Sequence, residues 1–105
     1  MRILFDQGTP VPLRKYLTEH SVTIAYEEGW SNLSNGDLLK SAEGKGYQIF
    51  VTTDRNLRYQ QNLSDRQMAI VVLLSTSWPK IRTQTDKVCD VINEIKLGDY
   101  VEISI

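Results

Sequence analysis

The sequence predicts one α/β domain, a three-layer sandwich in which a mostly parallel sheet of strand order 2-1-3-4-5 has helices on both faces. Strand and helix signals alternate along the chain, which is the pattern of successive βαβ units. Residues 68–74 are continuously apolar, as expected of a central strand in a parallel sheet. The 105 residues contain no repeat, low-complexity stretch or linker, so we expect a single domain over residues 1–105 with one core.

The first part of the chain is predicted to form a strand, a helix and a second strand. The largely apolar segment Arg2–Phe5 forms the first strand. Thr9 can cap a helix that has Pro10 at its first position and continues to about Glu19. Residues 21–26 then form a short second strand.

A polar loop at residues 27–35 leads into the second predicted helix. This helix begins at about Gly36 and ends near Gly44 or Gly46, because glycine commonly follows the last helical turn. The third strand, residues 47–52, follows at once.

The second half of the chain continues the alternation. Residues 57–62 are predicted to form a short helix or turn, and residues 68–74 the fourth strand. Pro79 lies in the first turn of the longest helix, which has apolar residues at helical spacing and ends at Gly98. Apolar and polar residues alternate over 101–105, which indicates a fifth, edge-type strand.

The composition is that of an ordinary globular protein. The formal net charge of −1 gives no overall attraction to nucleic acid, so any such binding must use a local patch. No apolar run approaches the roughly 20 residues that span a bilayer, and no signal peptide is visible, so we expect a soluble cytoplasmic protein. The single Cys89 and the single His20 exclude an internal disulfide and a Cys/His zinc site.

Three aspartates are expected to meet at the carboxyl edge of the sheet. Asp6 closes the first strand, Asp54 follows the third, and Asp37 lies at the start of the second helix. Parallel strands end at one edge, where open α/β sheets bind ligands. Carboxylate oxygens suit Mg²⁺ or Mn²⁺, and a bound ion lowers the pKa of a water and neutralises charge on a phosphoryl oxygen. The pattern therefore predicts a metal site for phosphate chemistry.

The same aspartates also fit structural roles. Asp54 can cap the helix that follows it, and Asp37 fits the last position of a capping box begun by Ser34. Asp6 can make a local turn bond. Spacing alone leaves both interpretations open.

The chain resembles a compact PIN-like domain, similar to the toxin ribonucleases of bacterial toxin-antitoxin pairs, in three segments: FDQGTP, GDLLKSAEGKG and IFVTTDRN. The resemblance covers roughly residues 1–75. It implies a metal-dependent endoribonuclease in which Asp6 is the first acid, Asp37 the helix acid, and Asp54 the acid of the Thr-x-Asp signature. The implied cofactor is Mg²⁺ or Mn²⁺. The implied partners are RNA and an antitoxin protein, and a homodimer is a further expectation.

Two features of the chain depart from the family pattern. Full-length PIN domains carry an additional segment that brings a further Glu to the metal, and this chain is too short to hold it. Compact relatives often have Glu directly after the first acid, where this chain has Gln7. Glu27 and Glu28 lie in the loop after the second strand and are candidates to supply the missing charge.

Polar and basic residues follow the third acid and are expected to contact RNA. Arginines there can hold phosphates, as can Lys80 and Arg82 after the fourth strand, although an ordinary solvated surface is an equal alternative. Trp30, Tyr59 and Trp78 can stack on unpaired bases, although packing against the core is the simpler role for a Trp. The expected substrate-binding residues are Thr53, Arg55, Asn56 and Arg58.

Two other functions fit the predicted topology. A phosphoacceptor receiver domain shares the strand order and would use Asp54 as its phosphorylated residue, with Ser75 or Thr76 as the hydroxyl after the fourth strand. It also needs a pair of acids after the first strand and a final helix, which the sequence lacks. The closer alternative is a PIN-like RNA-binding or protein-interaction module without catalysis, as Gln7 suggests.

Overall fold

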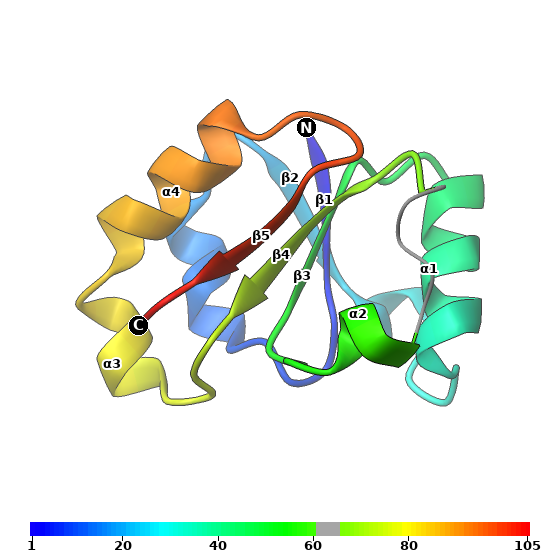
Figure 1. The fold of residues 1–105 in the computed structure, drawn as a ribbon, viewed down its shortest axis with the longest axis horizontal. Helices are drawn as coiled ribbons and strands as arrows, with labels where there is room; N and C mark the ends of the chain where they lie inside the picture. The colour runs from blue at the N-terminus through cyan, green and yellow to red at the C-terminus, as the bar shows by residue number, and fades with distance from the viewer. Residues whose placement is uncertain (61–65) are drawn as a thin grey trace.

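The computed structural model describes residues 1–60 and 66–105 and contains one parallel sheet between two layers of helices (Figure 1). The strands are β1 (Arg2–Phe5), β2 (Ser21–Ile24), β3 (Ile49–Thr52), β4 (Ala69–Leu73) and β5 (Tyr100–Ile103). Their order is β2-β1-β3-β4-β5 and all four pairings are parallel. The predicted α/β class and strand order are therefore confirmed.

The helices cover both faces of the sheet, as expected of βαβ units. Helices α1 (Asn35–Gly44) and α2 (Leu57–Gln60) lie on one face. The 3₁₀ helix η1 (Val11–Tyr16), α3 (Trp78–Arg82) and α4 (Thr85–Glu94) lie on the other. A second 3₁₀ turn, η2 (Ala25–Glu28), follows β2 directly.

Alternate residues of each strand pack into two separate hydrophobic cores, one on each face of the sheet, because successive strand side chains point to opposite faces. In β1, Phe5 packs with the η1, α3 and α4 side, whereas Leu4 packs with the α1 and α2 side. Every residue of β3 and β4 is buried, as expected of central strands covered on both faces. The central strands therefore fix the positions of the loops that follow them.

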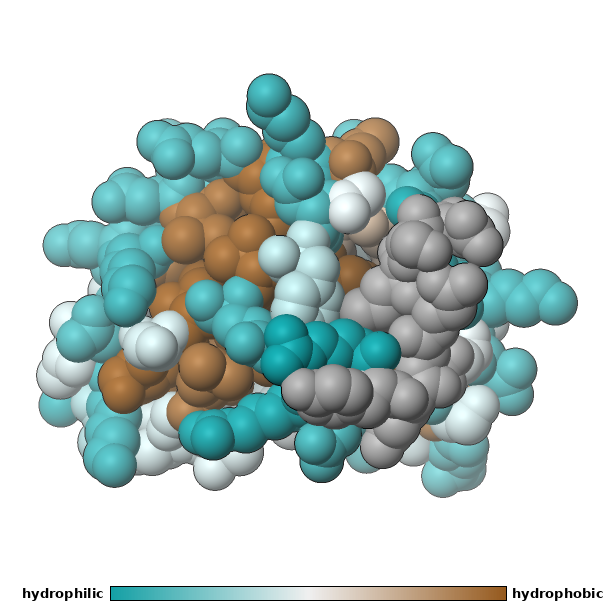
Figure 2. Space-filling view, viewed as in Figure 1, coloured by the Kyte–Doolittle hydropathy of each residue, from teal (hydrophilic) through white to brown (hydrophobic). Residues whose placement is uncertain are grey.

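Strand β5 is an edge strand, as its alternating sequence predicts. Figure 2 shows apolar side chains at the surface over β5 and the neighbouring part of α4. Val91, Val101 and Ile105 are half-buried there against the larger core. This edge of the sheet is consequently less completely covered than β3 and β4.

The first predicted helix is wrong in type and extent. Only six residues, Val11–Tyr16, are helical, and they form a 3₁₀ helix. Thr9 does not cap it; its hydroxyl lies 2.8 Å from Asp6 Oδ1 and 2.9 Å from the carbonyl oxygen of Val51. A tertiary hydrogen bond between strand-end loops thus replaces the predicted local cap.

The longest predicted helix is two helices, α3 and α4. The break occurs at Thr83, whose hydroxyl donates to the Lys80 carbonyl oxygen at 2.7 Å. Gln84 N then bonds to the Ile81 carbonyl oxygen at 2.8 Å, in the tighter pattern of a terminal 3₁₀ turn. The second helix also ends at Glu94, before the predicted end at Gly98.

The prediction for α1 is confirmed. Ser34 precedes the helix and its Oγ accepts a hydrogen bond from Asp37 N at 3.3 Å. Gly46 follows the helix with a φ of 86°, a conformation that glycine adopts without steric cost. Strand β2 is shorter than predicted, since the chain turns into η2 after Ile24.

Two further findings complete the fold. Of the short helix predicted at residues 57–62, residues 57–60 form α2, and the remainder falls outside the described residues. Over residues 1–60 and 66–105, no helix has the length and apolar character needed to cross a bilayer.

Candidate active site

Two of the three predicted acids lie at the carboxyl edge of adjacent central strands. Asp6 follows β1 directly, and Asp54 lies two residues beyond the end of β3. The strands are paired in parallel, with Phe5 opposite Val51, so both chains leave the sheet at the same edge. Asp6 N also donates to the Val51 carbonyl oxygen at 3.1 Å, which extends the pairing by one residue beyond β1.

Thr52, the last residue of β3, connects the two acids. It is 1% exposed, and its hydroxyl donates to Asp6 Oδ2. Thr52 Oγ1 in turn accepts a hydrogen bond from Asp54 N at 3.0 Å. We call these three residues the Asp6–Thr52–Asp54 network. One buried hydroxyl therefore fixes both the side chain of the first acid and the backbone of the second.

The Asp6 carboxylate is half-buried and held on both oxygens. Thr9 N donates to Oδ1 at 3.0 Å, and the Thr52 hydroxyl donates to Oδ2. Burial raises the pKa of Asp6 above its ordinary value, and the hydrogen bonds from Thr52 and Thr9 offset part of this rise. The site thus holds a carboxylate whose negative charge is poorly solvated.

Asp54 is oriented by its own loop and by the start of α1. Asn56 N donates to Asp54 Oδ1 at 2.9 Å, the local bond expected of an aspartate that begins a turn. Asn35 Nδ2 donates to Oδ2 at 3.0 Å. The position at the start of α1 that contacts Asp54 is therefore Asn35.

Asp37, the third predicted acid, lies elsewhere on α1. Its side chain is exposed, and its backbone N–H completes the cap formed by Ser34. Within the described part of the chain, no three Asp, Glu, His or Cys side chains are grouped closely enough to hold a metal ion together. The structure thus brings Asp6 and Asp54 into one network and leaves Asp37 outside it.

A small cleft opens beside Asp6. We call it the acidic cleft; its volume is about 130 Å³, and Gln7, Gly8, Trp30 and Asn35 are among the residues that line it with Asp6. A Cβ at Gly8 would lie 2.8 Å from Thr53 Oγ1 and 3.7 Å from Asp6 Oδ1. The absence of a side chain at Gly8 therefore lets the loops after β1 and β3 approach each other.

The oxygen donors at this edge fit a hard divalent cation. Asp6 and Asp54 carry carboxylates, and Gln7 and Asn35 line the acidic cleft with side-chain amides, of which the Asn35 amide donates through Nδ2 to Asp54. Mg²⁺ is commonly held by one or two carboxylates together with waters and substrate phosphates, so a third acid is not essential.

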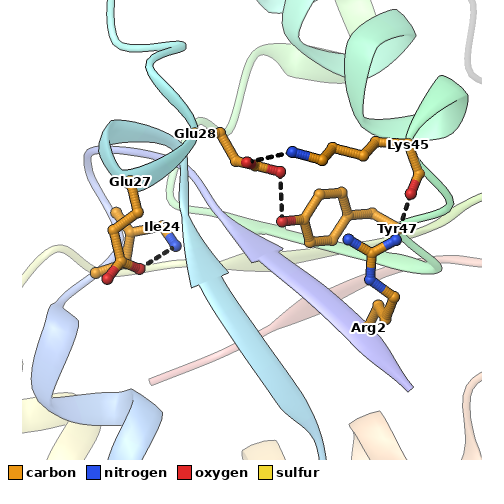
Figure 3. Close-up of polar contacts among 6 residues, drawn as sticks. All are labelled: Arg2, Ile24, Glu27, Glu28, Lys45 and Tyr47. Carbon is orange, nitrogen blue, oxygen red and sulfur yellow. Dashed lines mark hydrogen bonds and ion pairs between the residues drawn. The ribbon is translucent and has the colours of Figure 1, made fainter.

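Glu27 and Glu28, the candidates for the missing charge, have other partners (Figure 3). Glu27 Oε1 accepts from Ile24 N at 3.0 Å and so closes the turn at the end of β2. Glu28 accepts from Lys45 Nζ at 2.6 Å and from the Tyr47 hydroxyl at 2.7 Å. Glu27 therefore connects η2 to the end of β2, and Glu28 connects it to the segment that follows α1.

The predicted substrate-binding residues lie along the loop after β3 and the start of α2. Thr53 and Arg55 line a further cleft at the same edge. Asn56 is exposed, and its backbone N–H donates to the Asp54 carboxylate. Arg58 forms an exposed ion pair in which its Nη1 lies 3.9 Å from Glu102 Oε2. The side chain of Tyr59, a predicted stacking residue, falls outside the described part of the structure.

Sequence reasoning missed the three neutral residues that organise the site, Thr9, Asn35 and Thr52. Thr52 carried a weak signal, because it is the one polar residue in an otherwise apolar strand. The sequence predicts a helix-capping role for Thr9, which hides its contact with Asp6. Nothing in the local sequence distinguishes Asn35 from the other polar residues of its loop.

The fold and the site define a parallel α/β domain with a carboxylate-bearing cleft at its carboxyl edge. Comparisons with protein-family models, with curated proteins and with solved structures found no match.

Asp6→Asn is expected to stabilise the metal-free protein most at neutral pH. Because burial raises the Asp6 pKa, the folded protein binds this proton more tightly than the unfolded chain does. The free energy of unfolding therefore falls as the pH rises between the two pKa values, and asparagine removes that fall. Denaturant unfolding in EDTA from about pH 3 to about pH 7 measures the difference. A variant–parent difference that does not shrink on acidification would contradict the assignment.

Proposed function

We propose that this protein is a metal-dependent endoribonuclease that hydrolyses RNA phosphodiester bonds. One observation carries the proposal: acids that follow adjacent parallel strands are held by a single buried hydroxyl beside an open cleft. Carboxylates at the carboxyl edge of a parallel sheet are suited to phosphate chemistry through a divalent cation. The resemblance to PIN-like toxin ribonucleases gives the same reaction class.

In this proposal Asp6 and Asp54 hold Mg²⁺ or Mn²⁺. A bound ion of this kind lowers the pKa of a water and neutralises charge on a phosphoryl oxygen. Thr52 and Thr9 keep the Asp6 oxygens in place, and Asn35 and Asn56 N do the same for Asp54. Asp37 contributes its negative charge from outside the Asp6–Thr52–Asp54 network.

The residues after Asp54 position the RNA. Arg55 and Thr53 line the further cleft at the same edge of the sheet and supply donors for a phosphate. Asn56 and Arg58 continue this polar surface on the loop after β3 and the first turn of α2. Such contacts give affinity and orientation without reading sequence.

The test is cleavage of a single-stranded RNA by purified protein with Mg²⁺, with Mn²⁺ and with EDTA. We expect cleavage with either metal, none in EDTA, and heat exchange in a calorimetric titration with Mn²⁺. Failure to cleave any of several RNA sequences, together with no Mn²⁺ binding at millimolar concentration, would overturn the proposal.

The alternative is an RNA-binding or protein-interaction module without catalysis. The feature that favours it is the presence of two acids, with Gln7 at the position where compact relatives often have Glu. This alternative predicts RNA or protein-partner affinity that is the same in EDTA and in Mg²⁺, and no cleavage.

The expected antitoxin partner, the homodimer and the cytoplasmic location rest on the resemblance and the composition. Light scattering after size-exclusion chromatography gives the oligomeric state of the purified protein directly.

A further inference from the structure

The carboxyl edge has a second, larger cleft of about 540 Å³, formed by the loops after β3 and β4, by α3 and by the segment after β5. We call it the cationic cleft. Its walls include two apolar residues, Leu74 and Ile105. Its polar lining consists of Thr53, Arg55, Ser75, Thr76 and Lys80.

The charge of the cationic cleft favours an anion. Arg55 and Lys80 both line it, and none of the described lining side chains is acidic, so two positive side chains stand against the single α-carboxylate of Ile105. The acidic cleft has the opposite character, with Asp6 and no Lys or Arg among the described residues around it. The two clefts thus present opposite charges at one edge of the sheet.

The donors of the cationic cleft are held in place. Arg55 Nη2 donates to the Leu74 carbonyl oxygen at 2.6 Å, which leaves the other N–H groups of its guanidinium for a ligand. Ser75 Oγ accepts from Ser77 N at 3.0 Å, so its hydroxyl hydrogen can be donated elsewhere. Guanidinium, ammonium and hydroxyl donors are the groups that bind phosphate oxygens.

Thr53 connects the cationic cleft to Asp6. Its side chain lines that cleft, and its Oγ1 would lie 2.8 Å from a Cβ at Gly8, which itself lines the acidic cleft. A Cβ at Gly8 would also lie 3.7 Å from Asp6 Oδ1. The two clefts therefore lie on either side of the close approach between Gly8 and Thr53.

We propose that the cationic cleft binds an internal phosphate of the RNA strand, next to the phosphate that is cleaved at Asp6 and Asp54. This inference rests on the proposed function. It assigns Ser75, Thr76 and Lys80 to substrate positioning, and it places the rest of the bound strand on the β4 and β5 side of the acids.

The test compares Lys80→Gln with Arg82→Gln. Both residues are exposed on α3 and each change removes one positive charge, but only Lys80 lines the cleft. Fluorescence anisotropy in EDTA measures affinity for a labelled single-stranded RNA over a range of salt concentrations. We expect Lys80→Gln to weaken binding about tenfold and to reduce the salt slope by about 0.7, and Arg82→Gln to change affinity less than about twofold.

The labelled RNA is used with a 5′-hydroxyl and with a 5′-phosphate, because a terminal phosphate could also occupy the cleft. An internal phosphate predicts the same loss for both strands, and a loss confined to the 5′-phosphorylated strand would overturn the assignment. Equal effects of the two substitutions would also overturn it. Because binding is measured without metal, an RNA that binds through Lys80 but is never cleaved would refute the nuclease and leave the cleft assignment standing.

Discussion

Asp54→Asn is expected to lower the rate of metal-dependent RNA cleavage by about 100-fold or more, and Asp6→Asn to do the same. Each change removes one of the two carboxylate charges in the Asp6–Thr52–Asp54 network and keeps the shape of the side chain. Asn56 N can still bond to the remaining carbonyl oxygen at position 54, and the Asn35 amide can turn so that its oxygen accepts from the new Nδ2, so the loop should keep its conformation. A loss of activity would then reflect charge and not unfolding.

Asp37→Asn is the matched control, since it removes the same charge from an exposed position outside the network. We expect a loss below about tenfold, because a solvent-exposed charge is screened. Initial rates on one RNA substrate with saturating Mg²⁺, with circular dichroism of each variant, make the comparison. If Asp37→Asn were as damaging as Asp54→Asn, the third acid would have to join the other two when metal binds.

Thr52→Val is expected to lower the free energy of unfolding by about 2–4 kcal/mol. Valine has nearly the shape of threonine but lacks the hydroxyl, and Thr52 is fully enclosed. The change leaves Asp6 Oδ2 without a donor and Asp54 N–H without an acceptor. Two half-buried polar groups lose their partner, one of them charged, so the cost exceeds that of a single neutral hydrogen bond.

Thr52→Ser separates the contribution of the hydroxyl to stability from that of the packed methyl group. It keeps the oxygen and removes one methyl group, for which we expect about 1 kcal/mol. Urea unfolding of the three proteins measures both effects, and cleavage rates should follow the hydroxyl, with the serine variant active and the valine variant impaired. A valine variant as stable as the serine variant would show that Thr52 does not connect the acids.

The strands could be predicted from the sequence because their signal is local, whereas their order follows from the general rules for parallel α/β connections. The buried runs that became β3 and β4 need no information from elsewhere in the chain to be recognised as central strands. The cap of α1 was equally local, since Ser34 and Asp37 N are three residues apart. The helix boundaries around Thr9 and Thr83 were less predictable, because side-chain hydrogen bonds there compete with the helical pattern.

The amino-acid sequence by itself determined that this is a parallel α/β protein with acids at the ends of β1 and β3. Alternating apolar runs and parallel connections leave few other arrangements. Only the tertiary structure decided which polar residues meet those acids. Thr52 and Asp6 are 46 residues apart, and Asn35 and Asp54 are 19 apart. Contacts of that kind depend on how two loops approach across the sheet edge, which no local pattern encodes.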